Sequence, residues 1–280
     1  MWWGYNTNGL AHHRLEDAVR LIAETGYRAV GLTLDHHCLD PRDDNWPRQL
    51  QRVRRLLVEY RLRCVVETGG RFILDPWRKH QPTLLSTCPE ARQRRYNYLL
   101  HALQIAQELQ ADALSFWSGS ADQPTADHEL WSRLCEGCER LCTQAEQRQV
   151  RLAFEPEPGM FIETCDQFQR LYEHLGSRWF GLTLDVGHVH CLQDGSPQQR
   201  IEQWASSLFN VHLEDMRVGE HLHLPLGEGT LDLPGVIRTL QHVQYPFGVY
   251  VELSRDSHRA PEMLRQSLSY LRTITSSGSS

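Results

Sequence analysis

The sequence predicts a single-domain α/β fold, an eight-stranded parallel (β/α)8 barrel. Short apolar runs of β-forming residues alternate with helix-length amphipathic segments along 280 residues, without a gap or a change in composition. Alternating βα units build a parallel sheet, and eight such units fit a barrel, which needs about 250 residues. An open doubly wound sheet is the alternative, but the glycine-rich turns GxGxxG, GxxxxGKS and GxxxxGKT of nucleotide-binding sheets do not occur here.

Each expected element follows from its local pattern. Strands are expected at residues 2–6, 29–34, 63–68, 112–117 and 151–155, with three more beginning near residues 181, 210 and 249. Helices are expected at residues 15–26, 48–60, 89–109, 125–148, 164–174, 197–206, 233–242 and 260–274, where apolar residues recur with helical spacing. Residues 69–86 form a long irregular loop, and loops of this length are often functional. The barrel is expected over residues 1–275, with a flexible tail at 276–280.

Composition and charge limit the class of protein. Hydrophobic residues make up 40% and charged residues 23% of the chain, as in ordinary globular proteins. The net charge of −6 argues against non-specific binding to nucleic acid or anionic membrane. We see no secretion signal and no apolar run near the roughly 20 residues of a membrane span. We therefore expect a cytoplasmic protein with no membrane or nucleic acid partner.

Three of the eight cysteines are spaced as CxxCxxxC, at Cys135, Cys138 and Cys142. This spacing also places them on one face of the helix expected at 125–148, together with Leu134 and Leu141. Free cysteine packs as a small hydrophobe, and disulfides are rare in cytosolic chains. We interpret these residues as core thiols and not as a metal cluster.

Four strands in the second half of the chain end on groups that bind metal ions. These groups are Glu155, Asp185 with His188 close behind it, His212 and Glu252. The four successive ligands are 30, 27 and 40 residues apart, and a strand with its returning helix needs roughly 30 residues. Because active sites lie at the carboxyl ends of parallel strands, we expect the four side chains to converge there.

Such a set of ligands favours a particular chemistry. Three carboxylates and one imidazole suit one divalent ion of the group Mn²⁺, Mg²⁺, Co²⁺ or Zn²⁺. A metal ion at this position could polarise the carbonyl of a hydroxy-carbonyl substrate and stabilise the enediolate that forms when a neighbouring C–H loses its proton. Glu155 and Glu252 could each move a proton on its own face of the substrate carbon. An epimerase or an aldose–ketose isomerase needs this arrangement.

An ordered set of segments resembles the xylose isomerase-like TIM-barrel superfamily, which holds sugar and sugar phosphate isomerases and epimerases, inosose dehydratases and endonuclease IV. The segments are GYNTN, LEDAVRLIAETGYRAVGLTLD, FEPEPGMFIET, LTLDVGH, VHLEDM, LPLGEGTLDL and GVYVEL. The resemblance implies a TIM barrel with one metal ion, held by Glu155, Asp185, His212 and Glu252. It further implies that the two glutamates are the acid/base pair, and that His188 and Arg217 contact substrate oxygens.

Other residues at the same rim are candidates for substrate contacts. Glu67 and Trp117 end the third and fourth strands, and the indole could stack on the apolar face of a sugar. His223 is the favoured contact of the pair His221 and His223 in the GEHLHLPLGEG segment. Glu157, between two prolines, either orients a ligand or is solvated.

The 69–86 loop is basic, with Arg71, Arg78 and Lys79. These side chains could grip a phosphate or carboxylate of the substrate, although a solvated loop is the interpretation that we prefer.

The expected function is a metal-dependent sugar or sugar phosphate isomerase or epimerase acting through a metal-stabilised enediolate. A dehydratase acting on an inosose-like ketone is the first alternative. An endonuclease IV-like zinc phosphodiesterase is another, but the histidines that its three-metal cluster needs at the third and fourth strand ends are replaced by Glu67 and Trp117. A barrel that binds a metabolite without turnover is the non-enzymatic alternative. We expect a small sugar or polyol-derived substrate, and the sequence leaves open a homodimer and the identity of the substrate.

Overall fold

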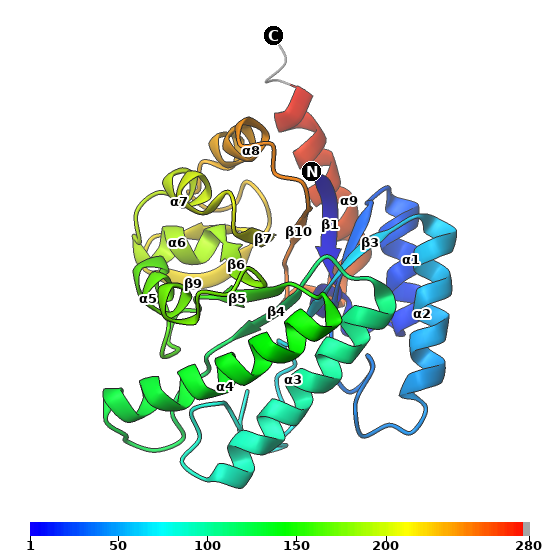
Figure 1. Ribbon diagram of the computed structural model, residues 1–280. Coiled ribbons are helices and arrows are strands. Elements are labelled where there is room, and N and C mark those ends of the chain that lie inside the picture. The colour runs from blue at the N-terminus through cyan, green and yellow to red at the C-terminus, as the bar shows by residue number, and fades with distance from the viewer. Residues whose placement is uncertain (277–280) are drawn as a thin grey trace.

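Eight parallel strands close into a barrel, as the sequence predicts. The computed structural model describes residues 1–276 (Figure 1). The strands are β1 (Trp2–Asn6), β2 (Ala29–Thr33), β3 (Arg63–Glu67), β4 (Leu114–Trp117), β5 (Leu152–Glu155), β6 (Phe180–Asp185), β7 (Leu208–Leu213) and β10 (Gly248–Val251). They pair in the order β1-β10-β7-β6-β5-β4-β3-β2, and β1 closes the ring on β2. The (β/α)8 fold is confirmed.

The expected helices surround the barrel with ends shifted by at most two residues. They are α1 (Leu15–Thr25), α2 (Trp46–Tyr60), α3 (Pro89–Leu109), α4 (Asp127–Arg148), α5 (Cys165–Leu175), α7 (Pro197–Trp204), α8 (Leu233–His242) and α9 (Ala260–Ser276). The chain leaves α1 through Gly26, whose φ of 115° suits glycine. The expected tail starts inside α9, and its residues 277–280 lie outside the described part of the chain.

Short elements at the strand ends were missed by the sequence patterns. They are the 3₁₀ helices η1 (Thr7–Leu10) and η2 (Ser257–Arg259), the helix α6 (Val186–Leu192), and the strands β8 (Asp215–Arg217) and β9 (Glu220–Leu224). Strands β8 and β9 pair in an antiparallel hairpin that is separate from the barrel. These elements are too short for a periodic pattern, and most of them shape the loops around the strand ends.

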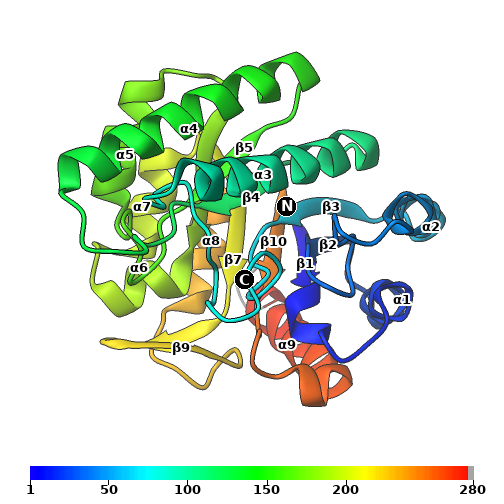
Figure 2. The same cartoon turned by 90° about the horizontal axis from the view of Figure 1, so that it is seen from below.

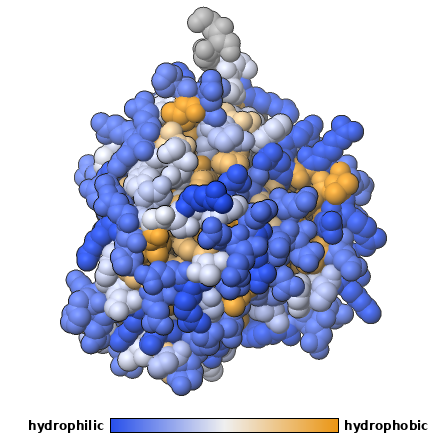
Figure 3. All heavy atoms as spheres, in the orientation of Figure 1, coloured by the Kyte–Doolittle hydropathy of each residue, from blue (hydrophilic) through white to orange (hydrophobic). Residues whose placement is uncertain are grey.

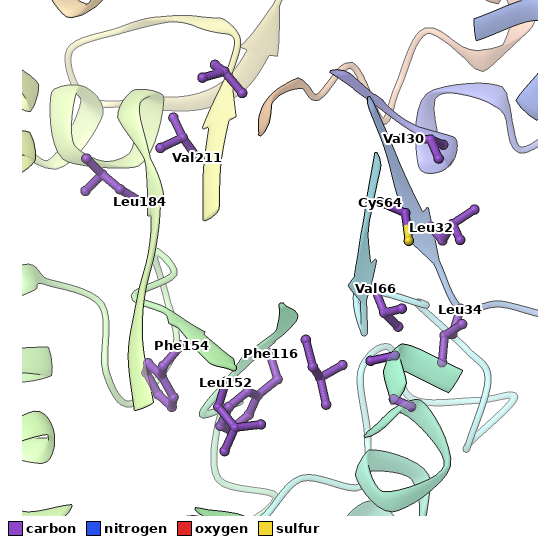
Figure 4. Close-up of a cluster of buried hydrophobic side chains, with 14 of the residues drawn as sticks. Val30, Leu32, Leu34, Cys64, Val66, Phe116, Leu152, Phe154, Leu184 and Val211 are labelled. Atoms are coloured by element: carbon purple, nitrogen blue, oxygen red, sulfur yellow. The ribbon is translucent and has the colours of Figure 1, made fainter. Parts of the chain in front are cut away.

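Side chains alternate between the two faces of each barrel strand. On β5, Leu152 and Phe154 belong to the large outer cluster, several members of which are drawn in Figure 4, whereas Ala153 belongs to a separate small cluster inside the barrel. The inner cluster is otherwise made of Ala29, Val65, Ala113 and Tyr250. The same alternation turns Glu155, two residues after Ala153, towards the barrel interior. The outer face therefore supplies the packing against helices, and the inner face supplies the site.

The cysteines of α4 pack as predicted. Cys135, Cys138 and Cys142 are buried free thiols in the outer cluster, and burial raises the pKa of Cys138 well above its ordinary value. Deprotonation is disfavoured there, so these thiols are poor ligands.

Few large apolar side chains are exposed among residues 1–276. The face drawn in Figure 3 is mostly hydrophilic, with scattered apolar patches. Within residues 1–276 we find no helix whose length and apolarity would let it cross a bilayer.

Candidate functional site

A cavity of about 540 Å³ opens at the carboxyl end of the barrel strands. Figure 2 looks onto this end of the molecule, where the loop between β3 and α3, drawn in cyan, lies over the strand ends. Residues from this loop, from the strand ends and from the β8–β9 hairpin line the cavity. Catalytic groups of parallel barrels lie at this end.

Glu155, Asp185, His212 and Glu252, here called the carboxylate–histidine cluster, meet at the bottom of this cavity. Their ligand atoms all lie within 4.8 Å of one another. His212 Nδ1 is 3.0 Å from Glu155 Oε1 and 2.9 Å from Glu252 Oε2. Asp185 Oδ2 is 3.9 Å from the same nitrogen. The register between β6 and β7 pairs Asp185 directly with His212, so the two side chains lie at the same height in the barrel.

This arrangement fits a divalent metal ion. Three carboxylates carry more negative charge than one imidazole N–H can balance, and buried charges require a partner. Two ligands of one zinc-like ion lie at most about 4.4 Å apart, and the three contacts of His212 Nδ1 are within this limit. The oxygen and nitrogen donors suit Mn²⁺, Mg²⁺, Co²⁺ or Zn²⁺, and the geometry does not distinguish among them.

Asp185 is held by the helix that begins directly after it. Its Oδ1 accepts a hydrogen bond of 2.9 Å from the backbone N–H of His188 and so caps α6. Its buried Oδ2 has no well-aligned hydrogen-bond donor among the described residues, and Nε2 of His188 lies 3.4 Å from it. The cap fixes the carboxylate while one oxygen is left directed at the cluster.

The ring of His212 is oriented from its other side. Its Nε2 lies 2.9 Å from Glu67 Oε1, which also accepts a hydrogen bond of 2.9 Å from Asn210 Nδ2. A carboxylate that accepts from one ring nitrogen leaves the other nitrogen free to bind metal. Glu67 lines the cavity, but this oxygen contacts His212. Glu67 therefore orients a proposed metal ligand, a role that the sequence did not indicate.

Burial and charge pull the carboxyl groups in opposite directions. Burial raises the pKa of Glu155 to about 8, against the nearby charge of His212. Burial would also raise the pKa of Glu252, but the imidazole of His212 and its hydrogen bond lower it to about 2. The pKa of His212 is raised well above its ordinary value because Glu67, Glu252 and Glu155 outweigh the effect of burial. A cation bound among these groups would therefore stabilise the negative charge of the cluster.

Two residues of this site had been missed in the sequence. Glu214 is fully buried, and its Oε1 accepts a hydrogen bond of 3.1 Å from the N–H of Gly187. It follows His212 by two positions, so strand alternation could have placed it on the same face. Asn8, in η1, donates a hydrogen bond of 2.6 Å to Glu252 Oε1. Asn8 lies in the GYNTN segment, but no local pattern shows its contact with Glu252, because the contact joins opposite ends of the chain.

A second group of side chains stands beside the cluster. His188, His221 and His223 offer nitrogens within 4.8 Å of one another, and His221 Nε2 is 3.1 Å from His188 Nε2. Burial lowers the pKa of His188 to about 3, so its ring is neutral. His221 and His223 share one side of β9, and both line the cavity. The pair thus faces the cavity together, a question that the sequence had left open.

Trp117 lines the cavity, and it is largely covered by two other side chains. The guanidinium of Arg95 lies 4.1 Å from the centroid of its ring, and the ring of His80 lies 5.0 Å away. The indole is 5% exposed, so it forms a wall of the cavity with little free face for a sugar.

Arg217 does not reach the cavity, contrary to the expectation from the resemblance. Its side chain is 51% exposed at the end of β8, 3.7 Å from Glu220 Oε2. Its Nη2 donates to the backbone carbonyl of Glu228. Asp215 and Met216 before it are buried, and the exposed guanidinium stands where β8 turns into β9.

Comparison with known proteins agrees with this architecture. A protein of Escherichia coli (strain K12) that carries the name of an L-ribulose-5-phosphate 3-epimerase, SgbU, is 22% identical over 251 residues, covering 79% of this chain and 87% of that protein. The inosose dehydratase of Bacillus velezensis is 24% identical over 152 residues, covering 48% of this chain and 51% of the relative. The aligned part thus spans about half the length of that dehydratase.

Solved structures share the whole fold. The D-allulose 3-epimerase from Methylomonas sp., in complex with D-allulose, superposes with a TM-score of 0.77 at 16% identity, covering 98% of this chain and 97% of that one. At this identity, the likeness shows the fold alone. The model of the family described as "Xylose isomerase-like TIM barrel" matches residues 19–274. The chain therefore belongs to the xylose isomerase-like TIM barrel family.

Proposed function

We propose that the protein is a metal-dependent epimerase or isomerase of a sugar or sugar phosphate. The observation that carries this proposal is the convergence of Glu155 and Glu252, from different strands, on one nitrogen of His212 at 3.0 and 2.9 Å. Two carboxylates that flank one point at the bottom of a cavity can serve the two faces of a substrate carbon. The epimerase names of the relative and of the solved structure support the same reaction class.

The carboxylate–histidine cluster would hold the metal ion. A divalent ion bound there would polarise a substrate carbonyl and offset the negative charge of an enediolate. Asp185 fits the role of a ligand because its carboxylate is buried and its Oδ2 lies 3.9 Å from Nδ1 of His212. Glu67 keeps the His212 ring in the orientation that leaves Nδ1 directed at the other three ligands.

The proton would be moved by the two glutamates. One carboxylate removes the proton from the carbon beside the carbonyl, and the other returns a proton from the opposite face, which inverts that carbon. Asn8 donates to Glu252 Oε1 and keeps that carboxylate in place. His188 and His223 line the cavity above the cluster, where their nitrogens would contact substrate hydroxyls.

A dehydratase is the second candidate, and one observation favours it. Inosose dehydratases match this chain over about half its length. The first step is shared, because removing a proton beside a carbonyl also starts the loss of a β-hydroxyl as water. The two reactions differ in the product and not in the residues that begin them.

The test is solvent exchange. Protein loaded with Mn²⁺, Mg²⁺, Co²⁺ or Zn²⁺ is incubated in D₂O with a panel of ketoses, ketose phosphates and an inosose, and products are analysed by proton NMR and mass spectrometry. We expect gain of one deuterium at the carbon beside the carbonyl, with inversion or a shift of the carbonyl. Loss of one water from the inosose would assign the dehydratase instead. Absence of exchange across the panel with all four metals would contradict both.

A further inference from the structure

We propose that the substrate carries a terminal phosphate group, which is bound by a cationic rim at the mouth of the cavity. The rim consists of Arg71, Lys79 and Arg255, all exposed residues that line the cavity. This inference rests on the proposed function, because it names the substrate class of the same site. It selects phosphorylated ketoses over free ketoses.

Two loops from distant parts of the chain bring these cations together. Arg71 and Lys79 belong to the loop between β3 and α3, whereas Arg255 follows Glu252 by three residues after β10. Arg71 Nη2 donates a hydrogen bond of 3.3 Å to the carbonyl of Ser254 and so ties the two loops. The rim is therefore attached to the segment that carries a proposed acid/base residue.

The rim cations lack anionic partners of their own. Within residues 1–276, neither the ammonium of Lys79 nor the guanidinium of Arg71 or Arg255 forms an ion pair with a carboxylate. The neighbouring Arg78 differs, because its Nε lies 2.9 Å from Asp75 Oδ2 and it does not line the cavity. The loop thus neutralises the cation that faces away from the cavity and leaves free those that face it.

Like charges gathered in this way repel one another. Partial burial and then the charge of Arg71 lower the pKa of Lys79; Glu157 acts in the opposite sense, and Arg255 lowers the pKa further. The positive charge of the rim is opposite in sign to the net charge of −6 of the whole chain. An anion bound at the rim offsets the repulsion among the three cations, and their local electrostatic field attracts the anion to the cavity.

The distribution of charge in the cavity selects where the anion lies. The bottom is lined by Glu155 and Glu252, which repel a phosphate, so its place is at the rim. The carbonyl end of the substrate then points down to the carboxylate–histidine cluster. A phosphate dianion offers three acceptor oxygens to the three cations, whereas a carboxylate carries one charge, so the rim favours the phosphomonoester.

Direct binding tests the rim without any turnover. Metal-free protein, kept in EDTA, is titrated with inorganic phosphate by calorimetry, and the double variant Lys79→Ala/Arg255→Ala is compared with Arg78→Ala. We expect phosphate affinity to fall about 10- to 100-fold in the double variant, as for the loss of charge-assisted hydrogen bonds, and to stay unchanged in Arg78→Ala. Circular dichroism melts establish that all the variants are folded.

Substrate preference gives the second measurement. For each ketose of the panel, kcat/KM is determined with and without a terminal phosphate, and the ratio of the two values is compared among the same variants. The ratio should exceed 1 in the wild type and fall about 10- to 100-fold in the double variant, with Arg78→Ala retaining the wild-type ratio.

The outcomes separate this inference from the proposed function. Equal phosphate affinity in the wild type and the double variant would overturn the phosphate rim, whether or not any ketose reacts. Preference for the free ketose would overturn it as well while leaving the isomerase intact. Loss of phosphate affinity in the double variant together with no exchange on any ketose would support the rim and reject the isomerase.

Discussion

The bottom and the mouth of the cavity are built by different parts of the chain and carry opposite charge. The carboxylate–histidine cluster lies at or directly after barrel strands, where the sheet register fixes each side chain. The cationic rim lies on two loops joined through Arg71 and the Ser254 carbonyl. The comparison teaches that strand register sets the chemistry, while loops choose the substrate, as is general for barrel enzymes.

The largest effect is expected at the bottom of the cavity. Changing Glu155 or Glu252 to Gln keeps the shape and an oxygen ligand but removes the group that moves the proton. Solvent deuterium exchange should fall by about 10²- to 10⁴-fold, with Glu146→Gln, an exposed residue of α4, as the control.

The same samples are checked for metal content and for folding. Metal content is needed because both glutamates are also proposed as ligands, so that a loss of metal and a loss of proton transfer are told apart. A Glu155→Gln/Glu252→Gln double variant that retains wild-type exchange would end the acid/base proposal.

A smaller effect, and of another kind, is expected from the neighbour of Glu155 on the outer face of β5. Phe154 packs against Phe116, Phe168 and Phe180, with ring centroids 5.2, 6.0 and 5.8 Å away. Phe154→Ala should lower the free energy of unfolding by about 3–5 kcal/mol, while the folded fraction still exchanges deuterium. Urea denaturation measures the first quantity. A variant of unchanged stability would break the division between packing face and functional face.

The smallest effect is expected one step away from the metal ligands. Glu67→Gln removes the charge that orients His212 through Nε2, and metal affinity should fall about 10- to 100-fold. Competition with a chromogenic chelator measures the affinity. Glu108→Gln serves as the control, because Glu108 is an exposed residue of α3 that lies near the start of β3. Equal metal affinities in both variants would show that Glu67 has no such role.

The fold followed from the sequence because its signals are local. Apolar runs and helical periods predicted the strands of the barrel and the helices around it. The side chains at the strand ends point into the barrel, so that four of them meet as expected: Glu155, Asp185, His212 and Glu252. Glu214 escaped notice although the alternation along β7 marks it. The spacing along the chain predicted which residues at or next to strands meet, because the barrel register places the ends of neighbouring strands side by side.

Residues outside the barrel strands were beyond such reasoning. Arg217 was expected at the substrate, and the β8–β9 hairpin turns it outwards. Asn8 joins the site through its contact with Glu252, and Arg255 lies on a loop that Arg71 ties to a distant segment, which no local pattern reveals. Glu67 sits at its expected strand end, but only the structure shows which ring nitrogen it faces.

The most direct test of the account is a titration of metal-free protein with each of Mn²⁺, Mg²⁺, Co²⁺ and Zn²⁺. Asp185→Asn is the matched variant, because Asn caps a helix as well as Asp does while removing one charge from the cluster. We predict a tight site in the wild type and at least about tenfold weaker binding in the variant, a difference of about 1.4 kcal/mol. A wild type that binds none of Mn²⁺, Mg²⁺, Co²⁺ and Zn²⁺ tightly, or an Asp185→Asn protein that binds the ion as well as the wild type does, would contradict the account.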